Sequence, residues 1–478
     1  MRRYKIISMV LVGMLLLTGC GKNAIKQSAE PTSKKEVTSN YTYNNEPKYI
    51  IAKRFNNKIM FGYIDKTGKE IVKPQYYAVG QYNEGISYVQ EYKDSQLFYG
   101  LIDSLGNKIL ESEYDKISYL SEDLLAVKSA GKTGYINKRG KFIIYPKYDY
   151  GYVFQEGLAK VIVDEKVGFI NKNGDYVIYP KYDKTDNITD ITGFMGGFTI
   201  VKSNGKFILI NKADEIIKTL DYETITEFSR DMYKVSKNKK YGLINASGNI
   251  VLEPKYSNLR SLDKDVKLIA FSSNGNQYGV MDKTFKEILP AKYDSSIFYS
   301  ENTIALYDNE SKKTLLFDTK GKLLARSDYK LLGGFSNNLC LVETKDSIYQ
   351  GYINKKAEVV IPLKYARAAD YKDGLAFVTE AKENEVIAGY IDTKGKYIWK
   401  TNTLFTINDL VKTKTESIEV KQQTVVKKAT TNTTATTTKK YSNSSYNDNY
   451  NYYDYDYNTY YKPNKSQDFI DAESDILN

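Results

Sequence analysis

The sequence predicts an all-β fold built from about ten tandem antiparallel β-meander repeats. Three observations predict this class. A unit of about 36 residues recurs along the middle of the chain, and each unit contains short apolar runs separated by turn residues. The composition is also rich in aromatic residues and poor in proline, with 45 Tyr and 9 Pro among 478 residues. A propeller-like arrangement and an open curved solenoid both fit these units.

The repeat is defined by an Asp or Asn that follows two apolar residues. We use this residue as the anchor of each unit, and it occurs at Asp65, Asp103, Asn137, Asn171, Asn211, Asn245, Asp282, Asp318, Asn354 and Asp392. Successive anchors are 34 to 40 residues apart. The sequence therefore predicts a repeat array over residues 47–405, without separate domains inside it.

Other residues keep fixed offsets from the anchor. Eleven residues after it, nine units have tyrosine, at Tyr76, Tyr114, Tyr148, Tyr182, Tyr222, Tyr256, Tyr293, Tyr329 and Tyr365. Three residues before it, eight units have glycine, at Gly62, Gly100, Gly134, Gly168, Gly242, Gly279, Gly351 and Gly389. Six of the nine prolines lie eight or nine residues after an anchor, so their role is architectural.

These positions divide each unit into strands. The two residues before the anchor are apolar, as in Tyr63-Ile64, which predicts a central strand covered on both faces. The anchor opens a tight turn closed by glycine, and a second strand such as 142–145 then ends at the proline. A third strand such as 158–161 follows a Gly, Asp or Asn, and a short fourth strand is indicated near Tyr152 to Phe154.

Length variation is concentrated in the hairpin that precedes each anchor. The interval from its turn residue to the anchor is 14, 16 or 18 residues in seven of eight cases, and even steps keep every side chain on its own face. We expect tips such as Glu91 to Phe98 and Ala381 to Val386 to be solvent loops on one side of the array. Tyr92 and Phe98 are the candidate ligand contacts there.

The segments Gly-Tyr-Ile-Asn-Lys-x-Gly, Tyr-Pro-Lys-Tyr-Asp and Gly-Leu-Ala-x-Val between Gly134 and Val161 resemble the WG repeats of bacterial proteins. The resemblance covers roughly three quarters of the chain, and the first two segments recur between Gly168 and Asp183. The tryptophan that names the family is replaced before each glycine, for example by Phe61 and Thr133. The resemblance implies a β-rich propeller-like or solenoidal fold that serves binding rather than catalysis.

The N-terminus has the features of an export signal. Arg2, Arg3 and Lys5 precede twelve uncharged residues, a run too short to span a bilayer comfortably as a helix. The run ends in Leu-Thr-Gly-Cys at residues 17–20, which resembles the lipobox of bacterial lipoproteins. The resemblance implies a signal peptide over residues 1–19 and a diacylglycerol on Cys20, which would anchor the protein at the outer face of a bacterial membrane. Residues 20–46 then read as a flexible spacer.

The C-terminal segment is compositionally biased. Residues 401–440 contain 13 Thr and seven Lys, and residues 441–461 contain nine Tyr among Asn, Asp and Ser. Neither part has strand or helix periodicity, so residues 406–478 are expected to form a disordered tail, either adhesive or simply solvated.

The composition excludes several kinds of chemistry. The chain has no histidine, so a Ser-His-Asp triad, a Cys-His pair or a His-ligated metal cannot be built. The anchors favour Asx turns over calcium sites because five of the ten are Asn. Residues 129–133 resemble the end of a P-loop but lack its first glycine, and Cys340 is interpreted as a core residue.

We therefore expect a non-enzymatic, lipid-anchored surface protein with no catalytic residue, cofactor or metal. Its array would act as a binding or scaffold module for a protein or a cell-wall polymer. Residues 41–400 have a net charge of +7, which is consistent with an anionic polymer as the partner. The net charge of +11 over the whole chain does not require a nucleic acid, which is not expected as a partner. A carboxylate-based cell-envelope hydrolase and a purely structural envelope spacer remain the alternatives.

Overall fold

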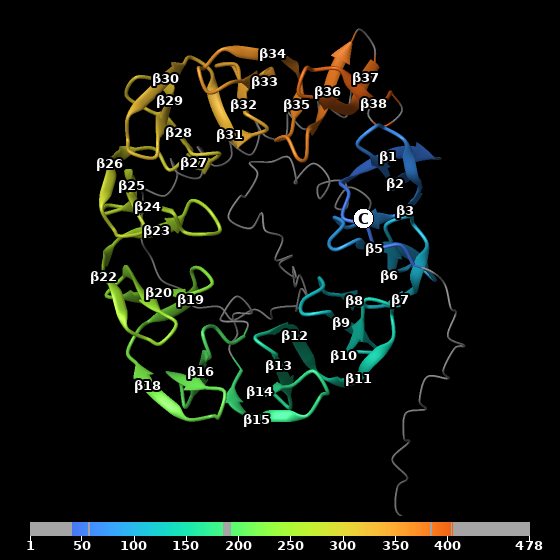
Figure 1. Ribbon diagram of the computed structural model, residues 1–478, viewed down its shortest axis with the longest axis vertical. Coiled ribbons are helices and arrows are strands. Elements are labelled where there is room, and N and C mark those ends of the chain that lie inside the picture. The colour runs from blue at the N-terminus through green and yellow to red at the C-terminus, as the bar shows by residue number, and fades with distance from the viewer. Residues whose placement is uncertain (1–40, 56–57, 185–192, 383–384, 403, 405–478) are drawn as a thin grey trace, which may run out of the picture. The chain divides into compact units, whose positions relative to one another are not determined.

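Ten antiparallel β-units make up the described part of this computed structural model, which covers residues 41–55, 58–184, 193–382, 385–402 and 404 (Figure 1). Each unit is a meander in which every strand pairs with the strand next to it in the chain. Among these residues, no helix is long and apolar enough to cross a lipid bilayer. The predicted all-β repeat fold is confirmed.

The first five units contain three or four strands each. Unit 1 consists of β1 (Lys48–Phe55), β2 (Lys58–Asp65) and β3 (Glu70–Tyr76). Unit 2 consists of β4 (Ala78–Val79), β5 (Ile86–Lys93), β6 (Gln96–Asp103) and β7 (Lys108–Tyr114). Unit 3 consists of β8 (Lys116–Ile117), β9 (Leu124–Ser129), β10 (Lys132–Asn137) and β11 (Phe142–Tyr148). Unit 4 consists of β12 (Tyr150–Gln155), β13 (Leu158–Val163), β14 (Lys166–Ile170) and β15 (Tyr176–Asp183). Unit 5 consists of β16 (Phe198–Ser203), β17 (Lys206–Asn211) and β18 (Ile216–Leu220).

The remaining five units have four strands each. Unit 6 consists of β19 (Thr224–Glu227), β20 (Met232–Lys237), β21 (Lys240–Asn245) and β22 (Ile250–Tyr256). Unit 7 consists of β23 (Asn258–Ser261), β24 (Leu268–Ser272), β25 (Tyr278–Asp282) and β26 (Glu287–Tyr293). Unit 8 consists of β27 (Ile297–Ser300), β28 (Thr303–Asp308), β29 (Lys313–Asp318) and β30 (Leu323–Ser327). Unit 9 consists of β31 (Lys330–Ser336), β32 (Leu339–Glu343), β33 (Gln350–Ile353) and β34 (Val359–Tyr365). Unit 10 consists of β35 (Arg367–Ala368), β36 (Leu375–Lys382), β37 (Glu385–Asp392) and β38 (Tyr397–Thr401).

The short fourth strand indicated by the sequence is the first strand of its sheet. It is present in eight of the ten units across the described residues, and in units 2, 3 and 10 it is only two residues long. Units 4 and 5 are joined into one seven-stranded sheet by a single residue pair, Asp183 with Lys202. We name the four strands of a complete unit a, b, c and d in chain order, and the anchor is the last residue of strand c or directly follows it.

The repeated glycine and proline act together in a β-bulge. In unit 3, Thr133 pairs with Tyr148 and Tyr135 pairs with Ile144, so strand d has two extra residues opposite Gly134. A Cβ atom on Gly134 would lie 2.6 Å from the Ile144 carbonyl oxygen. Seven of the eight units with this glycine have the same bulge, and the proline, where a unit has it, sits inside the bulge, where a missing N–H costs no ladder bond.

This bulge corrects one prediction. The sequence predicted that strand d ends at the proline, whereas β11 continues through Pro146 to Tyr148. Units 5 and 8 have Ile208 and Leu315 in place of the glycine, and their strands c and d pair without this bulge. The glycine is therefore needed only where strand d approaches strand c closely.

The hydrophobic core is divided among the interfaces between neighbouring units. One face of unit 1 contributes Tyr63 and unit 2 contributes Val89 to a shared cluster, and the same arrangement recurs at every later interface. Tyr63 and its neighbour Ile64 are both fully buried but belong to different clusters, on opposite faces of the sheet. The predicted central strand, covered on both faces, is confirmed.

The circuit of units closes, because unit 10 packs against unit 1 (Figure 1). The Tyr49 hydroxyl donates to the Asp373 carbonyl at 2.8 Å, and the Tyr390 hydroxyl donates to the Ile50 carbonyl at 2.8 Å. Trp399 packs in the same interface. We call this interface the seam. Of the two arrangements that the sequence left open, the closed, propeller-like one is observed.

Candidate functional site

The side chains of the ten anchors accept hydrogen bonds from the backbone of the turns that they open. In unit 8 the Asp318 carboxylate accepts the backbone N–H groups of Lys320 and Lys322, both at 2.9 Å. The N–H groups of Lys322 and Lys320 hold the pKa of this carboxyl below its ordinary value. The Asx-turn interpretation of the anchors is confirmed by these bonds and by their counterparts in the other units.

The repeated tyrosine at the end of strand d packs against the next unit. Tyr148 and Tyr365 are fully buried, and the Tyr148 hydroxyl donates to the Gly174 carbonyl in the anchor turn of unit 4, at 3.1 Å. The Tyr182 hydroxyl donates to Asp214 in the corresponding turn of unit 5, at 2.5 Å. Burial raises the pKa of Tyr365 to about 12. These rings stabilise interfaces and are not exposed stacking platforms.

Tyr92 and Phe98, the ligand contacts predicted from the sequence, lie in the hairpin of β5 and β6. Tyr92 pairs with Leu97 and Phe98 pairs with Glu91, so the two aromatic side chains point to opposite faces of the hairpin. Tyr92 is 53% exposed and its ring contacts Tyr77 edge-to-face at 4.6 Å, whereas Phe98 is half-buried. Each residue can therefore contact a ligand only from its own side of the sheet.

The predicted tip loop at Glu91 to Phe98 is a continuation of the strands. β5 and β6 extend to Lys93 and Gln96, and only Asp94 and Ser95, both with positive φ, form the turn. The two-residue turn of unit 4, at Asp164 and Glu165, has the same form. The longer hairpin of unit 2 thus adds paired residues to both strands, which preserves the side on which each residue lies. In units 8 and 9 the additional residues lie instead in longer turns, at residues 309–312 and 344–349.

The remaining residues singled out by the sequence have structural positions. Cys340 is fully buried, its thiol donates to the Gly333 carbonyl at 3.4 Å, and burial followed by the nearby Asp370 raises its pKa. A thiol in this setting is a core residue, as predicted. Residues 129–133 form the hairpin between β9 and β10. Cys20 lies outside the described residues.

A repeated glutamate that was not predicted links neighbouring units. Glu156, in the a–b turn of unit 4, accepts the N–H groups of Gly196 and Gly197 in unit 5 at 2.6 and 2.9 Å, and pairs with Lys212 at 3.3 Å. Glu122 and Glu301 make the same kind of contacts to their next units. The signal was present in the sequence, since each glutamate directly precedes the Gly, Asp or Asn that introduces strand b.

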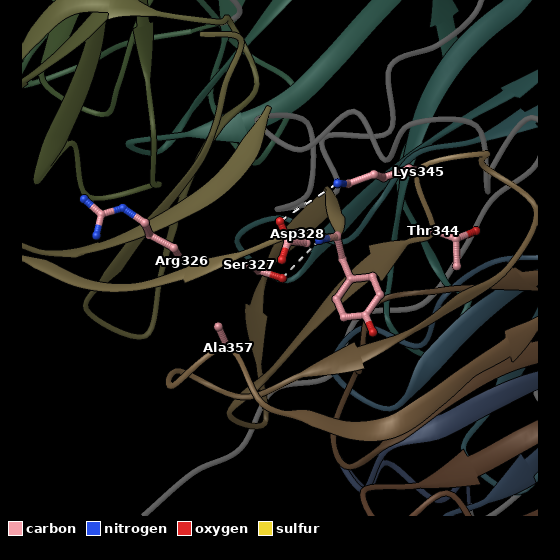
Figure 2. Close-up of a pocket in the computed structure, with 7 residues that line it drawn as sticks. Arg326, Ser327, Asp328, Thr344, Lys345 and Ala357 are labelled. Carbon is pink, nitrogen blue, oxygen red and sulfur yellow. Dashed lines mark hydrogen bonds and ion pairs between the residues drawn. The ribbon is translucent and has the colours of Figure 1, made fainter. Parts of the chain in front are cut away.

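A pocket of about 310 Å³ lies between units 8 and 9 (Figure 2). It is lined by Arg326, Ser327, Asp328, Tyr329, Thr344, Lys345 and Ala357. Figure 2 shows Arg326 pointing away from the pair formed by Asp328 and Lys345, whose charged atoms are 3.9 Å apart. Lys313 also approaches Asp328, at 3.4 Å.

The pocket exists where the repeat departs from its pattern. Unit 8 has Leu315 instead of the repeated glycine and Arg326 in the proline region, so β30 pairs without a bulge and ends at Ser327. Asp328 and Tyr329 then lie in the link to unit 9. The departure at Leu315 marks unit 8 in the sequence, but unit 5 departs in the same way at Ile208, so this signal alone does not locate the pocket.

The pocket chemistry suits the binding of a charged group. Its one carboxylate is engaged by two lysines, whereas hydrolysis by paired carboxylates needs two such groups on either side of a bond. Arg326, Asp328 and Lys345 are all exposed. A ligand with an anionic or zwitterionic group could exchange with these surface ion pairs at small energetic cost.

Comparison with solved structures finds several proteins at low identity. BamB from Moraxella catarrhalis is 12% identical, with a TM-score of 0.32 and coverage of 59% of this chain and 94% of that chain. A eukaryotic initiation factor is 10% identical, with a TM-score of 0.42 and coverage of 74% and 96%. Hsv2 from Kluyveromyces lactis is 11% identical, with a TM-score of 0.28 and coverage of 59% and 94%. Likenesses at this level carry no functional argument, and no curated protein matches the chain.

The family comparison is more specific. The model of the WG containing repeat matches residues 61–93, 99–132, 134–166, 168–207, 209–241, 241–276, 278–310 and 351–381. These stretches make up more than half of the chain, and each covers parts of the units defined by the anchors. The chain belongs to the WG containing repeat family.

Proposed function

We propose that this protein is a non-enzymatic, lipid-anchored surface protein whose closed β-array binds a protein or a cell-wall polymer. The anchor would be a diacylglycerol on Cys20, and the array would stand at the extracytoplasmic face of a bacterial membrane. The fold class and the family supply the β-scaffold on which such a binding surface would be built.

One observation carries the proposal: the repeated residues are used for packing, and the non-repeated residues remain on the surface. The repeated apolar pairs, such as Tyr63 and Ile64, fill the clusters between units. The anchors close turns and the glycines admit bulges. Variation is left to the b–c hairpins, where Tyr92 lies, and to the pocket beside Lys345. A scaffold with variable tips is the usual layout of a repeat protein that binds.

Charge and aromatic character indicate the kind of ligand. The pocket combines Arg326, Lys345 and nearby Lys313 against a single Asp328, so it has an excess of positive charge. The exposed Tyr92 ring offers a flat surface for sugar stacking. A cell-wall polymer with anionic groups fits both features, and a protein with acidic side chains fits the pocket.

Sedimentation with purified wall material tests the polymer form of the proposal. We expect the protein to be retained at low salt and released at high salt, because exposed charge pairs are screened. Lys345→Ala together with Tyr92→Ser should reduce retention, whereas Tyr179→Ser should not, although Tyr179 is 71% exposed on β15. Absence of retention at low salt would exclude a polymer ligand.

Lipid anchoring is tested independently of ligand binding. Mass spectrometry of the protein from a bacterial membrane fraction should show that it starts at a diacylated Cys20, and Cys20→Ser should release the folded protein from the membrane. An unmodified cysteine in a membrane-associated protein would refute the anchor and leave the binding role of the array untouched.

A further inference from the structure

Lysines are concentrated on one end of five consecutive units. The c–d turns of units 7, 8, 9, 10 and 1, at residues 282–286, 318–322, 354–358, 392–396 and 65–69, contain ten lysines and five acidic residues. We call these five turns the lysine arc. They are consecutive only because the seam joins unit 10 to unit 1. Gly68 in the turn of unit 1 lies directly against Ile398 of unit 10.

The lysines of the arc are available to a partner. Nine of the ten side chains are exposed, and within the described residues none of these nine lies within 4 Å of a carboxylate. The tenth, Lys355, pairs with Glu301 at 3.2 Å. In units 3, 4 and 5, by contrast, Lys138, Lys172 and Lys212 are held in ion pairs by the glutamates of preceding units.

The acidic groups of the arc offset half of the lysine charge, and they are engaged by hydrogen bonds close to the backbone. The carboxylates of Asp65, Asp282, Asp318 and Asp392 accept N–H groups of their own turns, at 2.8 to 3.1 Å. The fifth, Glu358, accepts the side-chain N–H of Asn354 at 2.8 Å. With ten lysines and five acidic residues, the arc has a net charge of +5.

The N-terminal segment enters the array on the same end of the sheets. Thr42 donates its N–H to Asp103 at 2.8 Å and accepts the Ser104 N–H at 3.0 Å, in the c–d turn of unit 2. Tyr43 lies beneath Lys138 in the c–d turn of unit 3, 4.7 Å from its ammonium. Asp103 and Ser104 are fully buried. Residues 41–44, which the sequence assigned to the spacer, thus lie against the c–d turns.

We propose that the c–d end of the array faces the membrane and that the lysine arc binds anionic phospholipid headgroups. This inference rests on the proposed lipid anchor on Cys20, because the segment that follows the anchor reaches the array on this end. A lipid chain combined with a cluster of basic residues is an effective pair of membrane signals. The b–c hairpins, including Tyr92 and the pocket residue Lys345, would then face away from the membrane.

Amine labelling of the lipidated protein in vesicles tests this orientation. The full protein is reconstituted into neutral phosphatidylcholine vesicles and into anionic phosphatidylglycerol vesicles, and the labelling rate of each lysine is measured by mass spectrometry. The arc lysines should react about fivefold more slowly in the anionic vesicles, and high salt should restore their rates. The exposed lysines Lys206, Lys239 and Lys312, on the b–c end, are internal controls whose rates should not change.

A pair of matched variants separates the arc from general charge. Replacing Lys283, Lys286, Lys320 and Lys322 by glutamine should abolish the protection of Lys394 and Lys396. The control replaces Lys206, Lys239 and Lys312 by glutamine and should leave that protection intact. All seven replaced side chains are exposed, so both variants should keep the wild-type thermal transition.

Three results would overturn the inference. Equal labelling of the arc in both kinds of vesicle would show that headgroups do not bind there. Protection of the arc by wall polymer in neutral vesicles, without an effect of phosphatidylglycerol, would assign the arc to the polymer instead. Absence of the diacylglycerol on Cys20 by mass spectrometry would remove the anchor itself, which distinguishes a failure of the proposed function from a failure of this orientation.

Discussion

Replacing Asp370 with asparagine should stabilise the protein at neutral pH and leave its stability in acid unchanged. Asp370 lies in the link between β35 and β36, and one carboxylate oxygen is 2.8 Å from the point that a Cβ atom on Gly333 would occupy. The residue is half-buried, and no hydrogen bond to it occurs among the described residues. Burial and, to a smaller extent, the charge of Asp370 raise the pKa values of Cys340 and Tyr352. Burial raises the pKa of this carboxyl to about 6 from an ordinary value of 3.8.

The magnitude follows from this difference in pKa. A shift of about two units corresponds to about 3 kcal/mol between the charged and neutral forms. The folded-state pKa is above the unfolded one, so the folded protein binds more protons between the two values, and stability falls as the pH rises from about 4 to about 6. Asp370→Asn lacks the charge, so its advantage over the wild type should grow through this window to about 3 kcal/mol at most.

Urea unfolding of the wild type and the variant at several pH values measures this effect. Asp123→Asn is the matched control, because Asp123 is an exposed turn residue with positive φ that asparagine tolerates. Its free energy of unfolding should differ from that of the wild type by the same small amount at every pH. If the advantage of Asp370→Asn is equal at pH 4 and pH 7, the carboxyl is not buried in the charged form and the reasoning fails.

Three further predictions concern the joints of the array. Gly134→Ala should lower the free energy of unfolding by about 1–3 kcal/mol in denaturant titration, because the new Cβ meets the backbone of the bulge, and an effect smaller than that of a surface substitution would contradict this role of the glycine. Glu156→Gln should lower the free energy of unfolding by about 1 kcal/mol, because it removes the negative charge that Lys212 and two backbone N–H groups contact. A double-mutant cycle with Lys212→Met should show coupling between the two side chains. Tyr390→Phe should lower the free energy of unfolding by about 1–2 kcal/mol, because the Ile50 carbonyl at the seam loses the hydroxyl that donates to it. The rate of amide hydrogen exchange should rise first in β1 and β37. A uniform rise over all strands would contradict a local effect at the seam.

Much of the fold follows from sequence spacing alone. The anchors, the covered strand before them and the Asx turns are local features, and each is found where the offsets placed it. The first strand of each sheet was only partly predicted, because two residues such as Lys116 and Ile117 carry no periodicity. Pro146 predicts a strand end because it lacks an N–H, but the bulge that accommodates it depends on pairing across the sheet.

The candidate site was harder to predict than the fold. Tyr92 and Phe98 are six residues apart, which would place them on one face of a single strand, but the turn between them reverses the chain and puts them on opposite faces. The pocket depends on contacts between units 8 and 9, and the lysine arc depends on the seam. Both arise from tertiary contacts that no spacing within one repeat encodes.

The seam also restricts how a chain of this kind can change its length in evolution. An open row of repeats gains or loses a unit at the cost of one interface, and all other interfaces keep their geometry. In this protein, units 10 and 1 complete a circuit through residues as far apart as Tyr49 and Asp373. Duplicating or deleting one unit would require every remaining pair of units to meet at a new angle, and tightly packed clusters resist such a change. Such a chain can therefore change the length of its hairpins more easily than the number of its repeats.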